Sequence, residues 1–291
     1  MSGTTRRERY RAILQGSRCI HPGSVFDPIS ARIAAELGYE IGIFAGSVAS
    51  LTVLGAPDIV LLTLSEFVEQ ARRITRASDL PVMVDADHGY GNALNVMRTV
   101  EELGTAGICA CTIEDTVLPA VYGAAEQTLI SLEEGVGKMR AALAARRDKS
   151  FVVIARTSAM GLTGTDDALR RIKAYADTGV DAVFLSGVKT KAQIEAASAA
   201  MKLPLVLGPL PAGTATADEL AKLSVRILLQ GHAPFMAAVQ AVYATMQALR
   251  AGKPAKEIAG IASAEMMQRL TREADYKRSA ATFLGVTTVK N

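Results

Sequence analysis

Short apolar segments alternate with longer segments of helical periodicity along most of the chain. Eight of the apolar segments are rich in Val, Ile and Leu and predict β-strands. They span residues 23–27, 41–46, 81–87, 107–115, 151–158, 182–187, 204–209 and 225–231. Polar residues do not alternate with apolar ones inside these runs, which is typical of parallel strands that are covered on both faces.

The segments between the predicted strands have the end signals of helices. The segment 65–78 begins at Ser65, a residue type that caps helix N-termini. The segment 131–147 begins with Ser131 and Glu134 at the spacing of a capping box. The chain is therefore predicted to repeat one strand–helix unit.

Eight such units predict a (β/α)8 TIM-type barrel, and no linker interrupts them. A doubly wound open sheet is the alternative, but even spacing without a break favours the barrel. We expect residues 1–291 to form a single barrel domain. Within it, residues 254–291 predict a helical C-terminal extension that packs on the barrel or on a neighbouring subunit.

Composition narrows the class of protein. Apolar residues make up 49% of the chain and charged residues 21%, as in ordinary globular proteins. The absence of Trp and a 5% aromatic content argue against stacking on nucleic acid. The basic cluster at residues 6–11 predicts a solvated face of an N-terminal helix, and the net charge of +3 suits a small anionic substrate.

The spacing of the cysteines and the length of the apolar runs indicate the cellular compartment of the protein. The three cysteines form no Cys-x-x-Cys pair, which predicts reduced thiols and a cytoplasmic protein. No apolar run approaches the roughly 20 residues of a membrane span. Neither nucleic acid nor a membrane is therefore an expected partner.

Polar residues gather at the carboxyl ends of the predicted strands. These ends share one rim of a barrel, where barrel enzymes carry out their chemistry. The residues are Asp27, Ser47, Asp85, Asp87, Glu114, Arg156, Ser158, Ser186 and His232. The amino ends of several strands are apolar or Pro by contrast, so the pattern predicts a central polar pocket at one rim.

Three of these residues have the chemistry of a metal site. Asp85 and Asp87 are two positions apart, and Glu114 ends the next strand. Carboxylates without Cys or clustered His favour a hard divalent cation, Mg²⁺ or Mn²⁺, over zinc. Arg156 stands one strand further on, and its planar guanidinium suits a substrate carboxylate. The segment 46–50 adds backbone N–H groups and hydroxyls for an anion.

Other interpretations of the same stretch compete with a metal site. An Asp-x-Asp pair alone is typical of turns and helix caps. Residues 88–94 half match a dinucleotide-binding loop, but Leu94 replaces the small third residue. Both a structural and a functional role stay open for His88. Lys189 lies in a loop and not at a strand end, so Schiff-base chemistry is disfavoured.

Five stretches together resemble the phosphoenolpyruvate mutase/isocitrate lyase superfamily. They are "VFDPISARIAAELGYEIGIFAGSVAS", "VDADHGYGN", "TIEDTVLP", "IARTSA" and "GHAPFMAA". The similarity covers about residues 18–250, and the segment "EDTVLPAVYG" followed by "LEEGVGKMRAAL" is most similar to the bacterial oxaloacetate decarboxylases. The resemblance implies a barrel whose last helix is exchanged between subunits, usually in a dimer of dimers, and one Mg²⁺ beside an α-keto acid or enolate.

The resemblance also implies roles for individual residues. Asp87 would be the carboxylate nearest to the metal ion, and Asp85 and Glu114 would hold water molecules bound to the ion. The residues implied around the substrate are Ser47 with the backbone of Gly46 and Val48, Arg156, Asp58 and His232. Ser47 and the backbone of Gly46 and Val48 would bind the keto-carboxylate end of the substrate, and Arg156 would hold a carboxylate. Asp58 and His232 would lie near the reacting group.

Departures from the superfamily pattern select among its reactions. Residues 116–132 contain no Cys, His, Lys or Arg, so the key groups of the carbon–carbon lyases and the phosphonate mutases are absent. Residues 207–210 are apolar where decarboxylase relatives carry polar groups, and Ser158 replaces the common Asn or Asp. Both changes bear on which keto acid is preferred.

The resulting hypothesis is Mg²⁺-dependent decarboxylation of oxaloacetate, or a close β-keto acid, to pyruvate and CO2. One alternative is a carbon–carbon bond lyase acting on a 2-alkylmalate or a methylisocitrate-like acid. The other is a protein that binds keto acids with a metal and turns nothing over.

Overall fold

The computed structural model describes residues 3–124 and 126–285. The chain divides into two compact units, Met1–Ala233 and Pro234–Asn291, and each is described by itself. The prediction of one domain over the whole chain is not tested by this division.

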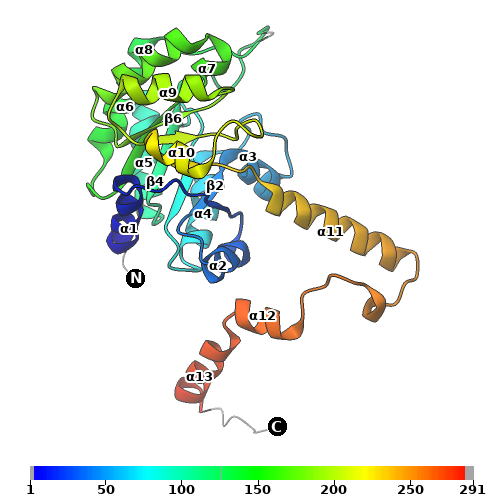
Figure 1. Cartoon of the computed structure of the whole chain (residues 1–291). Helices are drawn as coiled ribbons and strands as arrows, with labels where there is room; N and C mark the ends of the chain where they lie inside the picture. The colour runs from blue at the N-terminus through cyan, green and yellow to red at the C-terminus, as the bar shows by residue number, and fades with distance from the viewer. Residues whose placement is uncertain (1–2, 125, 286–291) are drawn as a thin grey trace. The chain divides into compact units, whose positions relative to one another are not determined.

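The first unit contains one sheet of eight parallel strands in chain order (Figure 1). The strands are β1 (Gly23–Ser24), β2 (Gly42–Ala45), β3 (Val82–Asp85), β4 (Ala110–Glu114), β5 (Val152–Thr157), β6 (Ala182–Leu185), β7 (Leu205–Leu207) and β8 (Val225–Leu228). All eight predicted strands are confirmed. Each is shorter than its apolar run, because the outer residues of the run already belong to the loops.

The first and last strands meet through the residue Ile20, which precedes β1. The Ile20 N–H donates to the Arg226 carbonyl at 2.9 Å, and the Leu228 N–H donates to the Ile20 carbonyl at 2.9 Å. Ile20 thus forms a parallel bridge with Ile227. This pairing closes the ring, and the predicted TIM-type barrel is confirmed.

Helices connect the strands on the outside of the sheet (Figure 1). In the first unit they are α1 (Gly3–Gln15), α2 (Pro28–Glu36), α3 (Gly46–Ala49), the π-helix η1 (Ser50–Leu54), α4 (Leu64–Thr75), α5 (Ala93–Thr105), α6 (Leu132–Ala145), α7 (Ala159–Leu162), α8 (Thr165–Ala176), α9 (Lys191–Ala200) and α10 (Ala217–Lys222). The second unit contains most of α11 (Ala233–Arg250), then η2 (Ala255–Glu257), α12 (Ala264–Leu270) and α13 (Glu273–Phe283). The helical C-terminal extension is confirmed.

Side-chain caps fix where the helices begin. Asp27 caps α2 by accepting a hydrogen bond from the Ser30 N–H, so this strand-end aspartate has a structural role. The predicted cap Ser65 of α4 is wrong by two residues. Thr63 and Glu66 form the capping box, because Thr63 Oγ1 accepts from the Glu66 N–H while Glu66 accepts from the Thr63 N–H.

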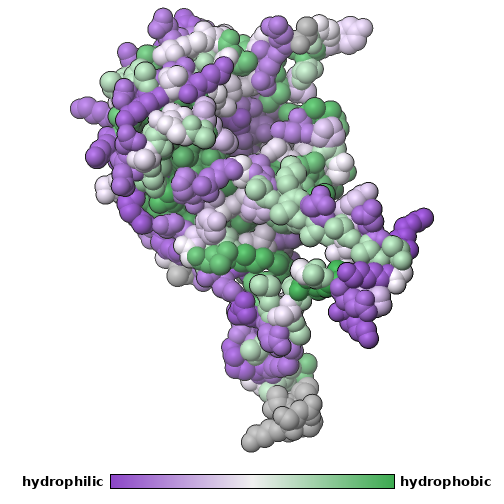
Figure 2. Space-filling view, turned by 45° about the vertical axis from the view of Figure 1, so that its right-hand side comes forward, coloured by the Kyte–Doolittle hydropathy of each residue, from purple (hydrophilic) through white to green (hydrophobic). Residues whose placement is uncertain are grey.

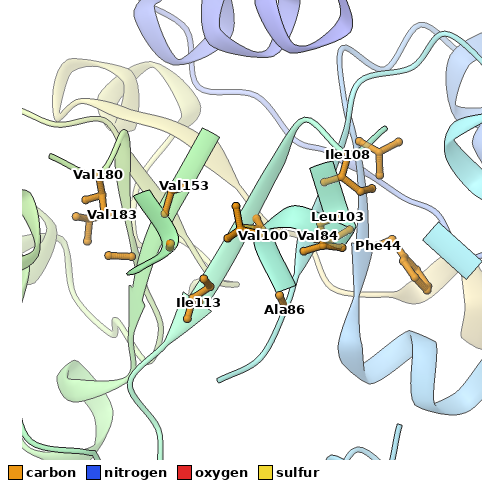
Figure 3. Packing of buried hydrophobic residues seen from close by; sticks show 14 of the residues in the cluster. Phe44, Val84, Ala86, Val100, Leu103, Ile108, Ile113, Val153, Val180 and Val183 are labelled. Carbon is orange, nitrogen blue, oxygen red and sulfur yellow. The ribbon is translucent and has the colours of Figure 1, made fainter. Parts of the chain in front are cut away.

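Two apolar clusters pack on the two sides of the barrel wall. The inner cluster includes Ile43, Met83, Ile154 and Phe184, with Tyr10 of α1 among its members. The outer cluster lies between strands and helices and includes the residues labelled in Figure 3: Phe44, Val84, Ala86, Val100, Leu103, Ile108, Ile113, Val153, Val180 and Val183. Burial of each large apolar side chain contributes about 1.5–3 kcal/mol, so both sides of the wall hold the strands in place.

The arginines of α1 contradict the prediction of a solvated helix face. Arg7 is 7% exposed, and its Nε donates to the Ile108 carbonyl at 2.9 Å. Its Nη1 also pairs with Asp148 at 2.8 Å. Arg11 donates to the Ser150 carbonyl at 2.9 Å. These hydrogen bonds and the ion pair attach α1 to the barrel.

The second unit consists of helices and short connections. Figure 2 shows one face of the whole chain, where hydrophilic residues cover much of the surface and apolar residues are visible between them. Among the residues that the structure describes, no helix is long and apolar enough to cross a membrane.

Candidate active site

A cavity of about 340 Å³ lies at the carboxyl ends of the strands. Every residue that lines it belongs to the first unit. Seven residues predicted for the site line this cavity: Ser47, Asp58, Asp85, Asp87, Glu114, Arg156 and His232. The predicted residues Gly46 and Val48 are buried and do not line it. The structure thus brings together side chains that are up to 185 positions apart, from Ser47 to His232.

The register of the sheet explains how Arg156 is held. Glu114, Arg156 and Phe184 stand in one row across β4, β5 and β6. Arg156 Nε lies 3.2 Å from Glu114 Oε2, and Arg156 Cζ lies 5.1 Å from the centroid of the Phe184 ring. The guanidinium therefore sits between a carboxylate on one strand and an aromatic face on the next.

Asp85 completes this arrangement from β3. Its Oδ2 accepts a hydrogen bond from Arg156 Nη1, and its Oδ1 accepts one from Thr112 Oγ1 at 2.8 Å. Thr112 is the register partner of Asp85 on β4. The sequence reasoning missed Thr112, although a hydroxyl residue inside the apolar run "ICACTI" was a signal of a polar partner.

Asp87 has an unusual backbone, with φ at 47°, in the left-handed region that Asp tolerates better than most residues. Its carbonyl accepts a hydrogen bond from the Glu114 N–H at 2.8 Å, which ties the end of β3 to β4. Gly46 packs against its carboxylate. A Cβ on Gly46 would lie 2.5 Å from Asp87 Oδ2, so a larger residue at position 46 would force this carboxylate to move.

The carboxylates of the cavity repel one another. Burial raises the pKa of Asp87 well above its ordinary value, and the charges of Asp85, Asp58 and Glu114 raise it further. Burial also raises the pKa of Glu114 to about 7, although Arg156 opposes the shift. The positive charge of the Arg156 guanidinium does not balance the negative charges of these carboxylates when they are ionised, so the cavity favours an additional cation.

The side-chain positions nevertheless do not form a ready ligand set. Within residues 3–124 and 126–285, no group of three His, Cys, Asp or Glu side chains is arranged to hold a metal ion. Arg156 pairs with both Asp85 and Glu114 and so occupies the space between them. The predicted metal ligands thus share one cavity but are partly engaged with Arg156.

Asp58 and His232 approach the cavity from two other sides. Asp58 follows η1, and burial and the charge of Asp85 raise its pKa. His232 follows β8, and burial lowers its pKa while Asp85 and Asp58 oppose this shift. The His232 Nδ1 lies 2.8 Å from Ser24 Oγ on β1. Sequence reasoning missed Ser24, a polar residue inside a short apolar run.

The role that was open for His88 is structural in this arrangement. His88 is 5% exposed and does not line the cavity. Burial lowers the pKa of its imidazole to about 4, and nearby Lys138 lowers it further. Its carbonyl accepts a hydrogen bond from Lys138 Nζ at 3.0 Å. The buried Lys138 of α6 therefore supports the backbone next to Asp87.

The departures noted in the sequence also lie at this cavity. Ser158 lines it, and so do Gly208 and Pro209 from the apolar end of β7. Leu118 and Gln127 line it from the segment 116–132, of which residue 125 lies outside the described residues. The ends of that segment are joined, because the Val117 N–H donates to the Thr128 carbonyl at 2.8 Å. These residues therefore bear on which substrate fits.

Known proteins are similar to this chain in sequence and in fold. An oxaloacetate decarboxylase of Bradyrhizobium diazoefficiens is 58% identical over 285 residues, which are 98% of this chain and 99% of the relative. The solved structure of an oxaloacetate acetylhydrolase with the inhibitor 3,3-difluorooxalacetate is similar with a TM-score of 0.86, at 28% identity and over 98% of this chain and 99% of that chain. A phosphonopyruvate hydrolase in complex with oxalate and Mg²⁺ gives a TM-score of 0.83, at 32% identity and over 96% of this chain and 99% of that chain. A family model described as phosphoenolpyruvate phosphomutase matches residues 11–250. The chain therefore belongs to the phosphoenolpyruvate phosphomutase family.

Proposed function

We propose that this protein is a decarboxylase that converts oxaloacetate to pyruvate and CO2 with the help of Mg²⁺. The observation that carries the proposal is the cavity in which Asp85, Asp87 and Glu114 face Arg156. A chain 58% identical over nearly its full length is named for the same reaction. The two negative charges of oxaloacetate match a cavity in which a bound cation and the Arg156 guanidinium would supply positive charge.

The donor chemistry of the cavity fits a hard divalent cation. Carboxylate oxygens are the ligands that Mg²⁺ prefers, and Mn²⁺ accepts the same ligands. Asp87 would hold the ion, and Asp85 and Glu114 would hold it directly or through water. Burial and mutual repulsion raise the pKa values of Asp87 and Glu114, so a positive charge beside them would stabilise their ionised forms. When bound, the ion supplies a Lewis acid for the keto-carboxylate end of the substrate.

The protein's own residues bind and orient the substrate. Ser47 lines the cavity beside Asp87 and offers a hydroxyl to the keto-carboxylate. The charges of Asp85 and Glu114 raise the pKa of Arg156 on balance, although its burial opposes this, so the guanidinium stays charged. A charged, aligned guanidinium can hold a carboxylate bidentately. These contacts orient the bond that breaks.

The reaction needs no strong base from the protein. The bond between the methylene carbon and the departing carboxylate breaks, and its electron pair moves toward the keto group as CO2 leaves. The methylene carbon then takes up one proton, which gives pyruvate. His232 would contribute a hydrogen bond near the reacting groups. This chemistry is compatible with a segment 116–132 that carries no Cys, His, Lys or Arg.

The test measures pyruvate formation from oxaloacetate with Mg²⁺, after EDTA treatment, and in Asp87→Asn. We expect both treatments to lower kcat at least about a hundredfold, because charge stabilisation at a metal is worth several kcal/mol. Asp177→Asn is a matched control, since Asp177 is exposed at the end of α8. Equal rates in all samples would contradict the proposed role of the metal.

Binding and turnover are separated by a second measurement. Oxalate resembles the enolate of pyruvate, so we expect calorimetry to detect oxalate binding that requires Mg²⁺ and is lost in Asp87→Asn. A protein that binds oxalate in this way but forms no pyruvate would be a binding protein and not a decarboxylase.

We also propose that the protein is a homo-oligomer in which a second copy covers α11. In the part of the chain that the structure describes, α11 has no buried residue, and it exposes Met236, Val239, Tyr243 and Met246 at helical spacing. Such an apolar stripe favours a protein partner over water. Light scattering coupled to gel filtration should report a dimer of dimers, and Val239→Asp combined with Tyr243→Asp should lower the measured mass. A monomeric native protein would contradict this proposal.

A further inference from the structure

The hydroxyl of Ser24 forms a hydrogen bond with the side chain of His232. Ser24 Oγ lies 2.8 Å from Nδ1 of His232, and the two residues are 208 positions apart. Ser24 is 9% exposed, so little water competes for its hydroxyl. The proposed reaction involves His232, whereas Ser24 has no direct part in it.

The closure of the barrel makes this contact. Ser24 is the register partner of Ile43, a member of the inner cluster, so its side chain belongs to the inside of the barrel. The bridge between Ile20 and Ile227 brings the ends of β1 and β8 side by side. His232 follows β8 and lines the cavity. Ser24 therefore supports His232 from the strand that is next to it in the ring.

Two observations decide which partner donates. Among the described residues, Ser24 Oγ forms no hydrogen bond other than the one to His232. If the hydroxyl accepted from Nδ1, its own hydrogen would lack a partner in a buried place, which costs free energy. In addition, His232 lines the cavity together with Asp58 and Asp85. An N–H at Nε2 is attracted by these carboxylates, whereas a lone pair there is repelled.

We propose that Ser24 is a positioning residue that donates its hydroxyl hydrogen to Nδ1 of His232 and keeps the N–H at Nε2, facing the substrate. This inference rests on the proposed function, because it assigns His232 a task within that reaction. The imidazole then acts as a hydrogen-bond donor to a substrate oxygen and not as a base. The lowered pKa of His232 supports a neutral ring, which is the state in which a tautomer can be selected.

Nuclear magnetic resonance of histidine-labelled protein tests the tautomer directly. The chain has three histidines, and single substitutions assign their signals. His21 is an internal reference, because its Nδ1 faces the Leu228 carbonyl at 2.9 Å and must carry the hydrogen there. We expect His232 to show the opposite tautomer, with the hydrogen at Nε2, and to lose this preference in Ser24→Ala. The hydrogen at Nδ1 of His232, or unchanged signals in the variant, would overturn the proposal.

Kinetics test the effect on turnover. A lost hydrogen bond of about 0.5–1.5 kcal/mol corresponds to a rate loss of up to about tenfold. We expect Ser24→Ala to lower kcat by up to that factor with KM within about twofold, and Ser24→Thr to restore most of the rate. Thr75→Val is the control, since Thr75 Oγ1 donates to the Ala106 carbonyl, away from the cavity, and its kcat should stay unchanged.

A double-mutant cycle separates positioning from general damage. In a His232→Ala background, Ser24→Ala should cause no further loss of kcat, because the group it positions is gone. Losses that multiply in the double variant would overturn the proposal. A wild-type protein that shows the predicted tautomer and its dependence on Ser24 but forms no pyruvate would support the positioning of His232 and contradict the proposed function.

Discussion

The carboxylate of Asp87 fills the space where a side chain on Gly46 would stand. A Cβ on Gly46 would lie 2.5 Å from Oδ2 and 2.6 Å from Oδ1 of Asp87. Both residues are at strand ends, after β2 and after β3, whose register places the preceding residues Ala45 and Asp85 side by side. The position of Asp87 therefore depends on the absence of a side chain on the neighbouring strand end.

Gly46→Ala tests this dependence. We expect the methyl group to displace the Asp87 carboxylate, to weaken Mg²⁺-dependent oxalate binding and to lower kcat by at least about tenfold, as small displacements of catalytic groups do. Calorimetry and the pyruvate assay measure these effects. Gly137→Ala is a matched control, because a Cβ there meets no atom within 4 Å. It lies inside α6 and should stabilise the protein by about 0.5–1 kcal/mol without changing kcat. Wild-type activity in Gly46→Ala would refute the steric argument.

The buried network around Asp115 predicts a large loss of stability in Asp115→Ala. Asp115 is 1% exposed, and its Oδ2 accepts hydrogen bonds from Tyr175 Oη at 2.8 Å and Arg171 Nη1 at 3.1 Å. Removal of the carboxylate leaves Asp167 as the remaining ion-pair partner of Arg171 and takes the acceptor from Tyr175 Oη, which we expect to cost about 1–3 kcal/mol. Urea unfolding should show this loss, whereas Glu101→Ala, which breaks the exposed pair with Arg147, should cost less than about 1 kcal/mol. Similar losses in the two variants would count against the network.

The pH dependence of stability should change in Asp167→Asn. Burial opposes ionisation of Asp167, but hydrogen bonds from Arg171, Thr163 and Arg170 lower its pKa to about 2. Its unfolded pKa is about 3.9, so the folded state binds the proton more weakly. The stabilisation is present above about pH 4 and is lost as the pH falls toward 2.

Urea unfolding at pH 7 and pH 3 measures this contribution. The free energy of unfolding of Asp167→Asn should be lower than that of the wild type by up to about 2 kcal/mol at pH 7, with a smaller difference at pH 3. The neighbouring residue Asp166 is exposed at the same helix end, and Asp166→Asn is the control. A difference that is the same at both pH values would argue against this assignment.

The three thiols should react slowly in the native protein. Burial raises the pKa values of Cys109 and Cys111, both of which are 0% exposed. Burial also raises the pKa of Cys19 to about 11, although Arg226 opposes it. Thiolate is the reactive form, so a disulfide reagent at pH 8 should modify the native protein far more slowly than protein in 8 M urea (about the strength that unfolds most domains). Rapid modification of a native thiol would contradict this expectation.

Local patterns in the sequence were sufficient for the architecture. Eight apolar runs without alternation predict parallel strands covered on both faces, and parallel strands place all their carboxyl ends at one rim. The carboxylates, Arg156 and His232 could therefore be assigned to a common cavity from the sequence alone. The errors were local ones: Ser65 was predicted as the cap of α4 in place of Thr63, and the arginines of α1 were predicted to face water.

The pairing of side chains within that cavity was not predictable from the sequence. Arg156 meets Glu114 and Phe184 because the register of β4, β5 and β6 aligns them, and a shift of the register would separate them. His88 follows Asp87 directly, yet its side chain is buried and does not line the cavity, whereas Asp87 does.

The sequence by itself determined the strand–helix repeat, the polar rim and the types of residue available for chemistry, because these depend on short-range periodicity and composition. Only the tertiary structure decided that Ser24 supports His232, that Gly46 makes room for Asp87 and that Arg156 lies between two carboxylates. Such contacts join residues far apart in the chain, and they arise from ring closure and strand register, which no local pattern encodes.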